Sequence, residues 1–424
     1  MIKERIKIPS IIQAVHQKGF FNLLSANVFI QIVAFASQLF VAGILSPAEI
    51  GSIKILQTFL SIFTLIGGLG FNNSVLKLCS ENIEENDKKI LFNAGLGFTL
   101  FSTLFTYLVL ISVNSFGVIS SDNLIRSLFP IALFPLITTS LFSVYTSYFL
   151  AQRKIRLLSR LTSVNKLIAI IGIIIFTYFL GIKGYYIAYN ISFILVLMIC
   201  LRKEPLADKK TLAEIYKNKK ALFKTHWLYA KPSLGAVVIA EFAAFADIIL
   251  INYLVEDKYQ IGFYSFALTL TVIVRFIPST VQLISEPYFS ALSNNKNDII
   301  TAYKKYLRLL LIIITATLIA VLIIVPPAIN WIYQRKYATV MIYFTPLAIG
   351  WSIRQINQLQ SAVLFGMGKM SHIAYSQFFS LISNTVILLI ALYYFGAIGA
   401  AYASIPSNVL SVFILYLFLR KNLK

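Results

Sequence analysis

The stretch LRLLLIIITATLIAVLIIVPPAINW (residues 307–331) decides the fold, because its only charged side chain is Arg308, next to its start. A helix needs about 20 apolar residues to cross roughly 30 Å of hydrocarbon, so this stretch predicts a transmembrane helix. We therefore predict an all-α polytopic membrane protein with about 12 transmembrane helices. The other predicted spans are 20–45, 51–78, 90–113, 125–150, 157–180, 184–201, 226–254, 260–289, 338–365, 372–395 and 397–419.

The composition agrees with this class. Hydrophobic residues make up 58% of the chain and charged residues 12%, against about 25% charged residues in soluble domains. The net charge of +21 does not indicate nucleic acid, because the basic residues lie in short gaps between apolar runs. The three histidines are dispersed, and we predict neither a metal site nor a disulfide between Cys79 and Cys200.

The basic residues also predict the orientation. Of 37 Lys and Arg residues, we assign 28 to the side of the two termini, 5 to the opposite side, and the remaining four (Lys54, Lys166, Arg275 and Arg354) to the spans. The positive-inside rule then places both termini in the cytoplasm. The connections on the outward side are short, so we expect the protein to act within the membrane.

The chain carries an internal duplication. A shift of 215 residues aligns GIKGYYIA (181–188) with GAIGAAYA (396–403), and Lys154 with Lys369. We predict two six-helix halves, residues 1–205 and 226–424, joined by a cytoplasmic basic linker at 206–225. Because each half has an even number of spans, the repeats are parallel, with a substrate path between them.

Polar residues inside the spans recur at helical spacing. Arg275, Ser279, Gln282 and Glu286 share one face, as do Arg354, Gln358 and Ser361; Lys54 begins another such stripe, and the first span carries Gln31. Uncharged members of a stripe can simply bind helices together, and Lys54 can snorkel to the interface. Arg275 and Arg354 lie mid-span, where charge marks a functional site, and Lys166 fits either interpretation. Glu241 lies near the middle of its span, where an unpaired carboxylate is either protonated or bound to a cation.

Catalytic and nucleotide-binding motifs are absent. We find no G-x-S-x-G, no H-E-x-x-H and no P-loop, since GMGKMS (366–371) lacks the required glycine spacing and the hydroxyl residue after Lys369. We predict that the protein is not an enzyme, needs no cofactor, and is not powered by ATP bound to this chain.

Three segments resemble the polysaccharide-exporting flippases: SPAEIGSIKILQTFLSIFTLIGGLGFNNSVLK (46–77), AFADIILINYLVEDKYQIGFYSFAL (244–268) and the closing GAIGAAYA. The resemblance is strongest to the O-antigen (Wzx) type, in the superfamily of MATE multidrug exporters and the lipid II flippase MurJ. It implies the V-shaped MATE-type architecture and a place in the bacterial inner membrane.

The resemblance also implies a cargo, an undecaprenyl-diphosphate-linked oligosaccharide moved by alternating access, with coupling to Na⁺ or H⁺ and contacts with other polysaccharide-assembly proteins. A diphosphate requires cationic partners, and guanidinium suits phosphate best. Arg275 and Arg354 are therefore the main candidates for binding it, with Lys54 and Lys166 secondary. Gln31, Gln282 and Gln358 are candidates for solvating the sugars. For the cation coupling that the resemblance implies, Glu241 and Asp247 are the candidate residues.

Two other functions compete with this one. A MATE-type drug exporter would line its cavity with carboxylates and aromatic residues to hold organic cations, whereas this chain has two mid-span arginines beside Glu241 and Asp247. A membrane glycan polymerase or ligase would carry a large outward catalytic loop, whereas the outward connections here are short.

Overall fold

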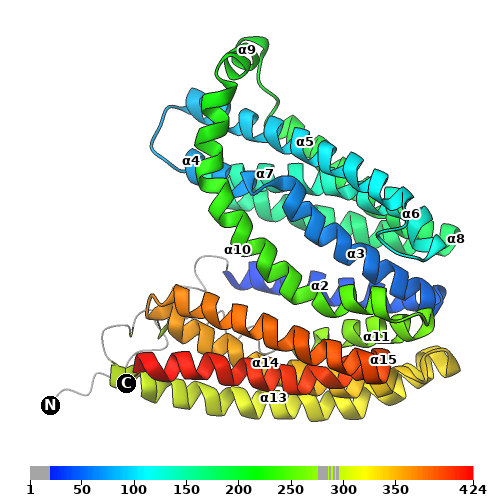
Figure 1. The fold of residues 1–424 in the computed structure, drawn as a ribbon. Coiled ribbons are helices and arrows are strands. Elements are labelled where there is room, and N and C mark those ends of the chain that lie inside the picture. Colours follow the sequence, from blue (N-terminus) through cyan, green and yellow to red (C-terminus); the bar gives the residue numbers. More distant parts are fainter. Residues whose placement is uncertain (1–19, 276–284, 286–287, 290–291, 293–295, 424) are drawn as a thin grey trace. The chain divides into compact units, whose positions relative to one another are not determined.

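The computed structural model of the chain describes residues 20–275 and 296–423, with residues 285, 288, 289 and 292 between them. This part of the chain is helical and contains no β-strand, which confirms the predicted class (Figure 1). The elements are α2 (Phe20–Ile44), α3 (Pro47–Gly68), α4 (Phe71–Cys79), α5 (Glu85–Ser115), α6 (Asn123–Leu133), α7 (Pro135–Ala151), α8 (Ile155–Lys203), α9 (Lys209–Lys217), α10 (Lys219–Leu254), α11 (Lys258–Leu270), α13 (Lys296–Tyr333), the 3₁₀ turn η1 (Gln334–Tyr337), α14 (Val340–Gly366) and α15 (Met370–Leu423).

Seven helical segments in the described part of the chain are long and apolar enough to cross a membrane. Two of them, α8 and α15, each cover two predicted spans. Counting α8 and α15 twice gives nine crossings. Helices α2, α11 and α14 lie in the three other predicted spans, 20–45, 260–289 and 338–365, so the helices agree with about 12 crossings.

Helices α8 and α15 are both bent at a single glycine, at equivalent positions of the predicted duplication. Gly181 has φ 60° and ψ −144°, and Gly396 has φ 59° and ψ −148°. A side chain strongly disfavours this backbone region, so glycine permits the bend. Three residues later, a Cβ added to Gly184 would overlap the Phe176 carbonyl, and one added to Gly399 would overlap the Ala391 carbonyl. The structure thus places the same tight turn at both ends of the 215-residue offset.

The span predicted at 51–78 is not one helix. It is divided into α3 and α4 by Leu69 and Gly70, whose φ angles of 49° and 72° are left-handed and stop the helical ladder. The predicted linker at 206–225 likewise contains a helix that periodicity did not indicate, α9, capped by Asp208, which accepts a hydrogen bond from the Thr211 amide at 3.0 Å.

The chain divides into two compact units. Unit 1 comprises residues 1–44, 66–108 and 134–233, and unit 2 comprises residues 45–65, 109–133 and 234–424. Each unit contains segments from both predicted six-helix halves, so those halves stay a prediction.

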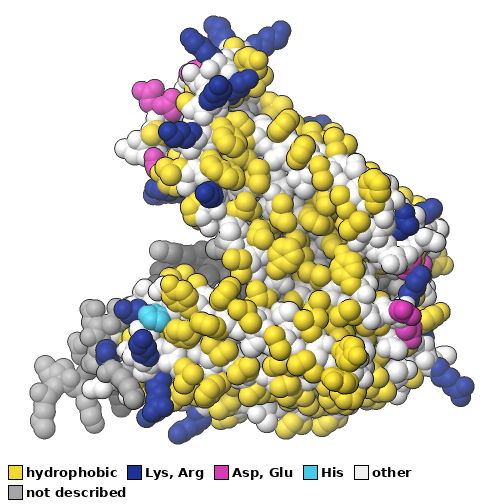
Figure 2. Space-filling view, viewed as in Figure 1, with side chains coloured by type: hydrophobic (Ala, Val, Ile, Leu, Met, Phe, Trp, Pro, Cys, Tyr) yellow, Lys and Arg dark blue, Asp and Glu magenta, His cyan; other side chains and the backbone are white. Residues whose placement is uncertain are grey.

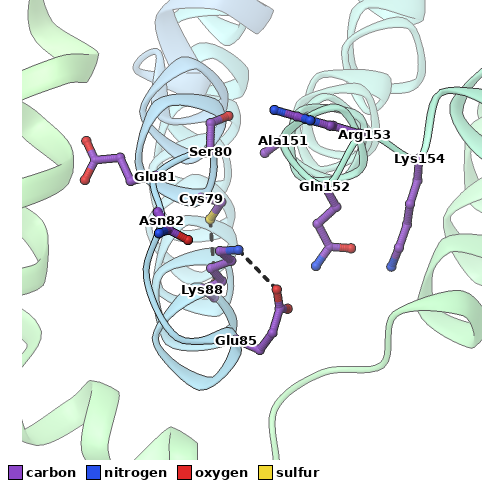
Figure 3. A pocket seen from close by; sticks show the side chains of 10 residues that line it. All are labelled: Cys79, Ser80, Glu81, Asn82, Glu85, Lys88, Ala151, Gln152, Arg153 and Lys154. Atoms are coloured by element: carbon purple, nitrogen blue, oxygen red, sulfur yellow. Dashed lines mark hydrogen bonds and ion pairs between the residues drawn. The ribbon is translucent and has the colours of Figure 1, made fainter.

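Unit 1 is built around aromatic side chains. The Phe92 ring stacks on Tyr148 with 4.1 Å between centroids and meets Tyr145 edge-on at 5.1 Å, and all three are buried. Beside this core lies a cavity of about 590 Å³, lined by residues 79–82, Glu85, Lys88 and residues 151–154 (Figure 3). Its lining carries charges of both signs, and Lys88 is paired with Glu85 at 3.1 Å. The lining therefore has no strong preference for one sign of ligand.

Unit 2 packs α13, α14 and α15 around a second apolar cluster that includes Phe289, Leu310 and Leu359. In the same unit, α3 and α11 approach so closely that a Cβ added to Gly51 would lie 2.9 Å from the Gly262 amide nitrogen. A Cβ on Gly262 would in turn overlap the Pro47 carbonyl. Only glycine at both positions permits this backbone approach.

Candidate functional site: a cationic cluster in unit 2

Four of the candidate charges meet inside unit 2. The Asp247 carboxylate on α10 interacts electrostatically with Lys54 on α3, with Arg275 just after α11, and with Arg354 on α14. The Arg275 guanidinium also repels both Lys54 and Arg354. The cluster therefore contains three cations and one anion, with a net positive charge.

Both guanidinium groups stack on one indole ring. The Arg275 Cζ lies 4.4 Å from the centroid of Trp351, and the Arg354 Cζ lies 4.9 Å from it. The face of an indole attracts cations, which offsets part of the repulsion between the two arginines. Guanidinium N–H groups suit paired hydrogen bonds with an oxyanion, and both of these groups are held at the same ring.

Asp247 is held by its neighbours. The Tyr264 hydroxyl donates to Oδ2 at 2.7 Å, and the Ile248 amide donates to Oδ1 at 2.8 Å. Tyr264 is almost fully buried. The carboxylate is thus fixed in place, while carboxylate oxygens keep lone pairs for a further donor or a cation.

A cavity of about 80 Å³ adjoins Asp247 and Arg354. Its polar lining comes from α10, α11, α14 and α15: Asp247, Tyr264, Trp351, Arg354, Asn384, Thr385, Ser404, Ser407 and Asn408. The Asn384 Oδ1 atom is buried and has no hydrogen-bond partner among the described residues. A water molecule occupies about 30 Å³ in the liquid, so the cavity can hold an ion with one or two waters but not a sugar.

The other candidate residues do not line this small cavity or lie outside the described residues. Gln358 lies one turn beyond Arg354, and its Oε1 atom is buried without a partner in the described structure. Gln31 on α2 and Lys166 on α8 belong to unit 1, where both side chains are exposed. Glu241 is half-buried on α10 but does not line the small cavity. Gln282 lies outside the described residues.

Sequence reasoning missed Trp351 and the polar residues of α15. Trp351 precedes Arg354 by three residues, so both lie on one face of α14. That spacing was a usable signal, but an aromatic residue in an apolar helix more often belongs to the core. Asn384 and Asn408 are separated by the Gly396 bend, and no stripe joins them in the sequence.

Comparisons with known proteins identify the fold and the family. No curated protein sequence matches the chain. The lipid II flippase MurJ, solved in an inward closed conformation, superposes with a TM-score of 0.78 at 16% identity, over 94% of this chain and 87% of that one. An inward-facing multidrug resistance MATE family transporter of the MOP superfamily gives a TM-score of 0.72 at 13% identity, over 93% and 94%.

A third solved structure, a mutant of the Vibrio cholerae MATE transporter VcmN, gives a TM-score of 0.61 at 15% identity and covers 96% of both chains. At these identities the likeness establishes a shared fold. The model of one family, described as polysaccharide biosynthesis protein, matches residues 17–293. The chain is therefore a multi-pass membrane protein with the MurJ and MATE fold, and it belongs to the polysaccharide biosynthesis protein family.

Proposed function

We propose that the protein is a flippase that moves an undecaprenyl-diphosphate-linked oligosaccharide, an O-antigen unit or a similar glycan, between the leaflets of the bacterial inner membrane. The observation that carries the proposal is the pair of guanidiniums on Trp351, with Lys54 in the same cluster. A diphosphate carries two adjacent anionic groups, and two guanidiniums held at one ring can pair with them. Membership of a polysaccharide biosynthesis family supports a glycan as the rest of the cargo.

We further propose that transport is driven by Na⁺ or H⁺ acting at Asp247. The cavity beside it presents carboxylate, amide and hydroxyl oxygens, the ligands that hard cations prefer, and its volume suits an ion. Glu241 is the secondary coupling candidate. Asp247 belongs to the same cluster as the two arginines. An ion bound at Asp247 would therefore strengthen the positive electrostatic field around the phosphates.

The proposed setting follows from the sequence. Both termini face the cytoplasm, and residues 1–205 and 226–424 act as two lobes that alternately open the path to either side. No chemical step is required, so the protein is a transporter and not an enzyme. We also propose that the protein contacts other polysaccharide-assembly proteins.

The test is complementation of a flippase-null strain, read out as polysaccharide on the cell surface. We expect the wild-type chain to restore display, and Arg275→Ala or Arg354→Ala to abolish it while the protein stays at its normal level in the membrane. Arg308→Ala is the matched control, because this exposed arginine of α13 lies outside the cluster. Normal display by the two cluster variants would contradict the proposed role of the arginines.

A MATE-type drug exporter is the second candidate, since its fold is shared and Asp247 could hold an organic cation. The net positive charge of the cluster disfavours such a cargo. Drug resistance on expression, with no effect on surface glycan, would favour this candidate over the flippase.

A further inference from the structure

Helix α9 presents apolar side chains to its surroundings. None of its nine residues is buried, and the exposed fractions are 50% for Leu212 and 72% for Tyr216. Leu212, Ile215 and Tyr216 follow one another at i, i+3 and i+4, so they share one face, whereas Lys210 and Glu214 lie on the opposite face. Leu206, just before the helix, is 60% exposed as well. A helix of this pattern in water leaves its apolar face unpartnered.

Basic residues surround this face. The segment 202–224 contains eight Lys and Arg residues and three acidic ones, and one of the three, Glu204, is paired with Lys154 at 3.7 Å. The Lys219 ammonium also lies 4.4 Å from the centre of the Tyr216 ring. Figure 2 shows Lys and Arg side chains over α9, with hydrophobic side chains between them. The surface combines an apolar strip with positive charge.

Contacts within unit 1 fix the depth of α9. Before the helix, the Ala207 amide donates to Asn93 Oδ1 at 3.0 Å. Asn93 lies about one turn beyond the charged residues at the start of α5, where that helix becomes apolar. The helix therefore begins at the level at which the sequence of α5 changes from charged to apolar residues, where a spanning helix is expected to meet the lipid headgroups.

The chain after α9 packs against α5. Phe223 packs against Phe98 of α5, with 5.4 Å between ring centroids. Nearby, the buried His226 lies with its Nδ1 2.7 Å from Ser74 Oγ. Both ends of α9 are thus fastened to the body of unit 1, while α9 itself stays uncovered.

We propose that α9 is a membrane-surface anchor that binds anionic phospholipid headgroups. Leu212, Ile215 and Tyr216 enter the boundary between headgroups and acyl chains, and the lysines around them meet the lipid phosphates. Apolar insertion and positive charge are the two terms that hold an interfacial helix on a membrane. Negative charge complements this surface, whereas the strip of three apolar side chains is small for a stable protein interface. The proposal is independent of the cargo and of the transport cycle.

The test uses the full chain, reconstituted into nanodiscs of phosphatidylcholine alone or mixed with phosphatidylglycerol. A solvent-sensitive fluorophore is attached at Tyr216→Cys, on the apolar face, or at Glu214→Cys, on the opposite face. The native thiols of Cys79 and Cys200 are buried and contribute little label. With phosphatidylglycerol, we expect a blue shift and several-fold weaker quenching by acrylamide at position 216, and no change at position 214.

The role of charge is tested by replacing Lys209, Lys210 and Lys217 with Gln in the chain labelled at position 216. Each lysine should change the ratio of membrane-bound to free helix about fivefold, and added salt should act in the same direction. The three lysines are exposed, so these changes leave the fold intact, which the melting temperature verifies.

Three outcomes would overturn the proposal. Equal quenching at positions 214 and 216 in every lipid would mean that α9 projects into water. Equal protection of position 216 from quenching, with and without phosphatidylglycerol, would show that anionic headgroups are not the ligand. Protection that rises with protein concentration and ignores lipid would assign the face to a second protein molecule.

Discussion

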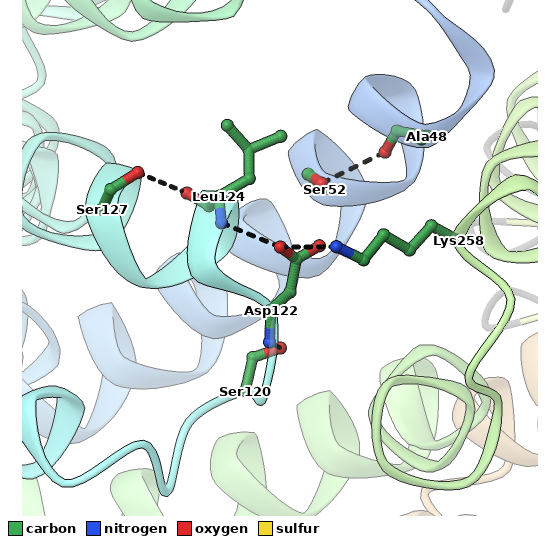
Figure 4. A network of polar contacts seen from close by, with 7 residues as sticks. All are labelled: Ala48, Ser52, Ser120, Asp122, Leu124, Ser127 and Lys258. Carbon is green, nitrogen blue, oxygen red and sulfur yellow. Dashed lines mark hydrogen bonds and ion pairs between the residues drawn. The ribbon is translucent and has the colours of Figure 1, made fainter.

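Lys258 and Asp122 form an ion pair in unit 2, with 2.9 Å between the Lys258 Nζ and the Asp122 Oδ1 (Figure 4). Asp122 is mostly buried and also accepts a hydrogen bond from the Leu124 amide at 2.8 Å, at the start of α6. Close by, the Asn252 amide group donates to the Ile119 carbonyl at 3.0 Å. These contacts connect two segments that the sequence assigns to different halves and to the outward side of the membrane.

If the two predicted halves separate on the outward side during transport, this ion pair must break. Joining Asp122→Cys to Lys258→Cys with a bifunctional thiol reagent should therefore stop transport, and a cleavable reagent should allow recovery on reduction. The measurement is glycan flipping in proteoliposomes. Each single cysteine variant treated with the same reagent is the control, and undiminished transport in the cross-linked protein would mean that this contact persists throughout the cycle.

Trp351 should position the two arginines. Trp351→Leu removes the ring on which both guanidiniums stack, and we expect transport to fall about 5- to 30-fold, since a desolvated cation–π contact contributes ~1–2 kcal/mol. Trp351→Phe keeps an aromatic face and should lose less. Trp331→Leu is the matched control, because Trp331 is 85% exposed on α13. Equal losses of transport in Trp351→Leu and Trp331→Leu would mean that losing any tryptophan impairs the protein, and that Trp351 has no special role at the arginines.

Asp247 and Glu241 can be separated by their isosteric amides. Asp247→Asn should abolish the response of transport to an imposed Na⁺ or H⁺ gradient, because the cavity then lacks its carboxylate. Glu241→Gln should retain the response, since that side chain does not line the cavity. The rate of flipping with and without each gradient is the measurement, and the reverse pattern would move the coupling site to Glu241.

The two bends should depend on glycine through their backbone conformation. Gly181→Ala and Gly396→Ala force a side chain into a backbone conformation that costs about 1–3 kcal/mol, so both should lower the melting temperature in detergent. Gly97→Ala in α5 is the control, because nothing lies within 4 Å of the added Cβ. That variant should be neutral or stabilising, as alanine favours a helix by ~1 kcal/mol.

The Cys79 thiol should be nearly unreactive at neutral pH. Its Sγ lies 3.6 Å from the Lys88 carbonyl, and burial raises the pKa of this thiol to about 12. Because the thiolate reacts, alkylation by iodoacetamide should accelerate about tenfold for each pH unit and reach no plateau below about pH 12. An unfolded chain, with an ordinary thiol pKa, should level off near pH 9. A plateau near pH 9 in the folded protein would show that the thiol is exposed.

The sequence predicted more of the fold than of the site. Apolar length predicts spans, and periodicity places Arg275 and Arg354 on defined faces of their own helices. Periodicity does not report how neighbouring helices are rotated, so the meeting of Lys54 with these arginines could not be foreseen, and snorkelling remained an alternative for Lys54. Trp351 carried no charge to distinguish it from core residues. Helix α9 was not predicted because it is short and lies in a charged segment.

The bends at Gly181 and Gly396 bear on how the protein is made. Each joins two apolar helices through one glycine, with almost no polar chain between them. The connection between the two helices is too short to remain in water on the outward side while the second helix is still being synthesised. Each pair should therefore leave the insertion machinery as a unit, so that biosynthesis proceeds by hairpins at these two points and by single helices elsewhere.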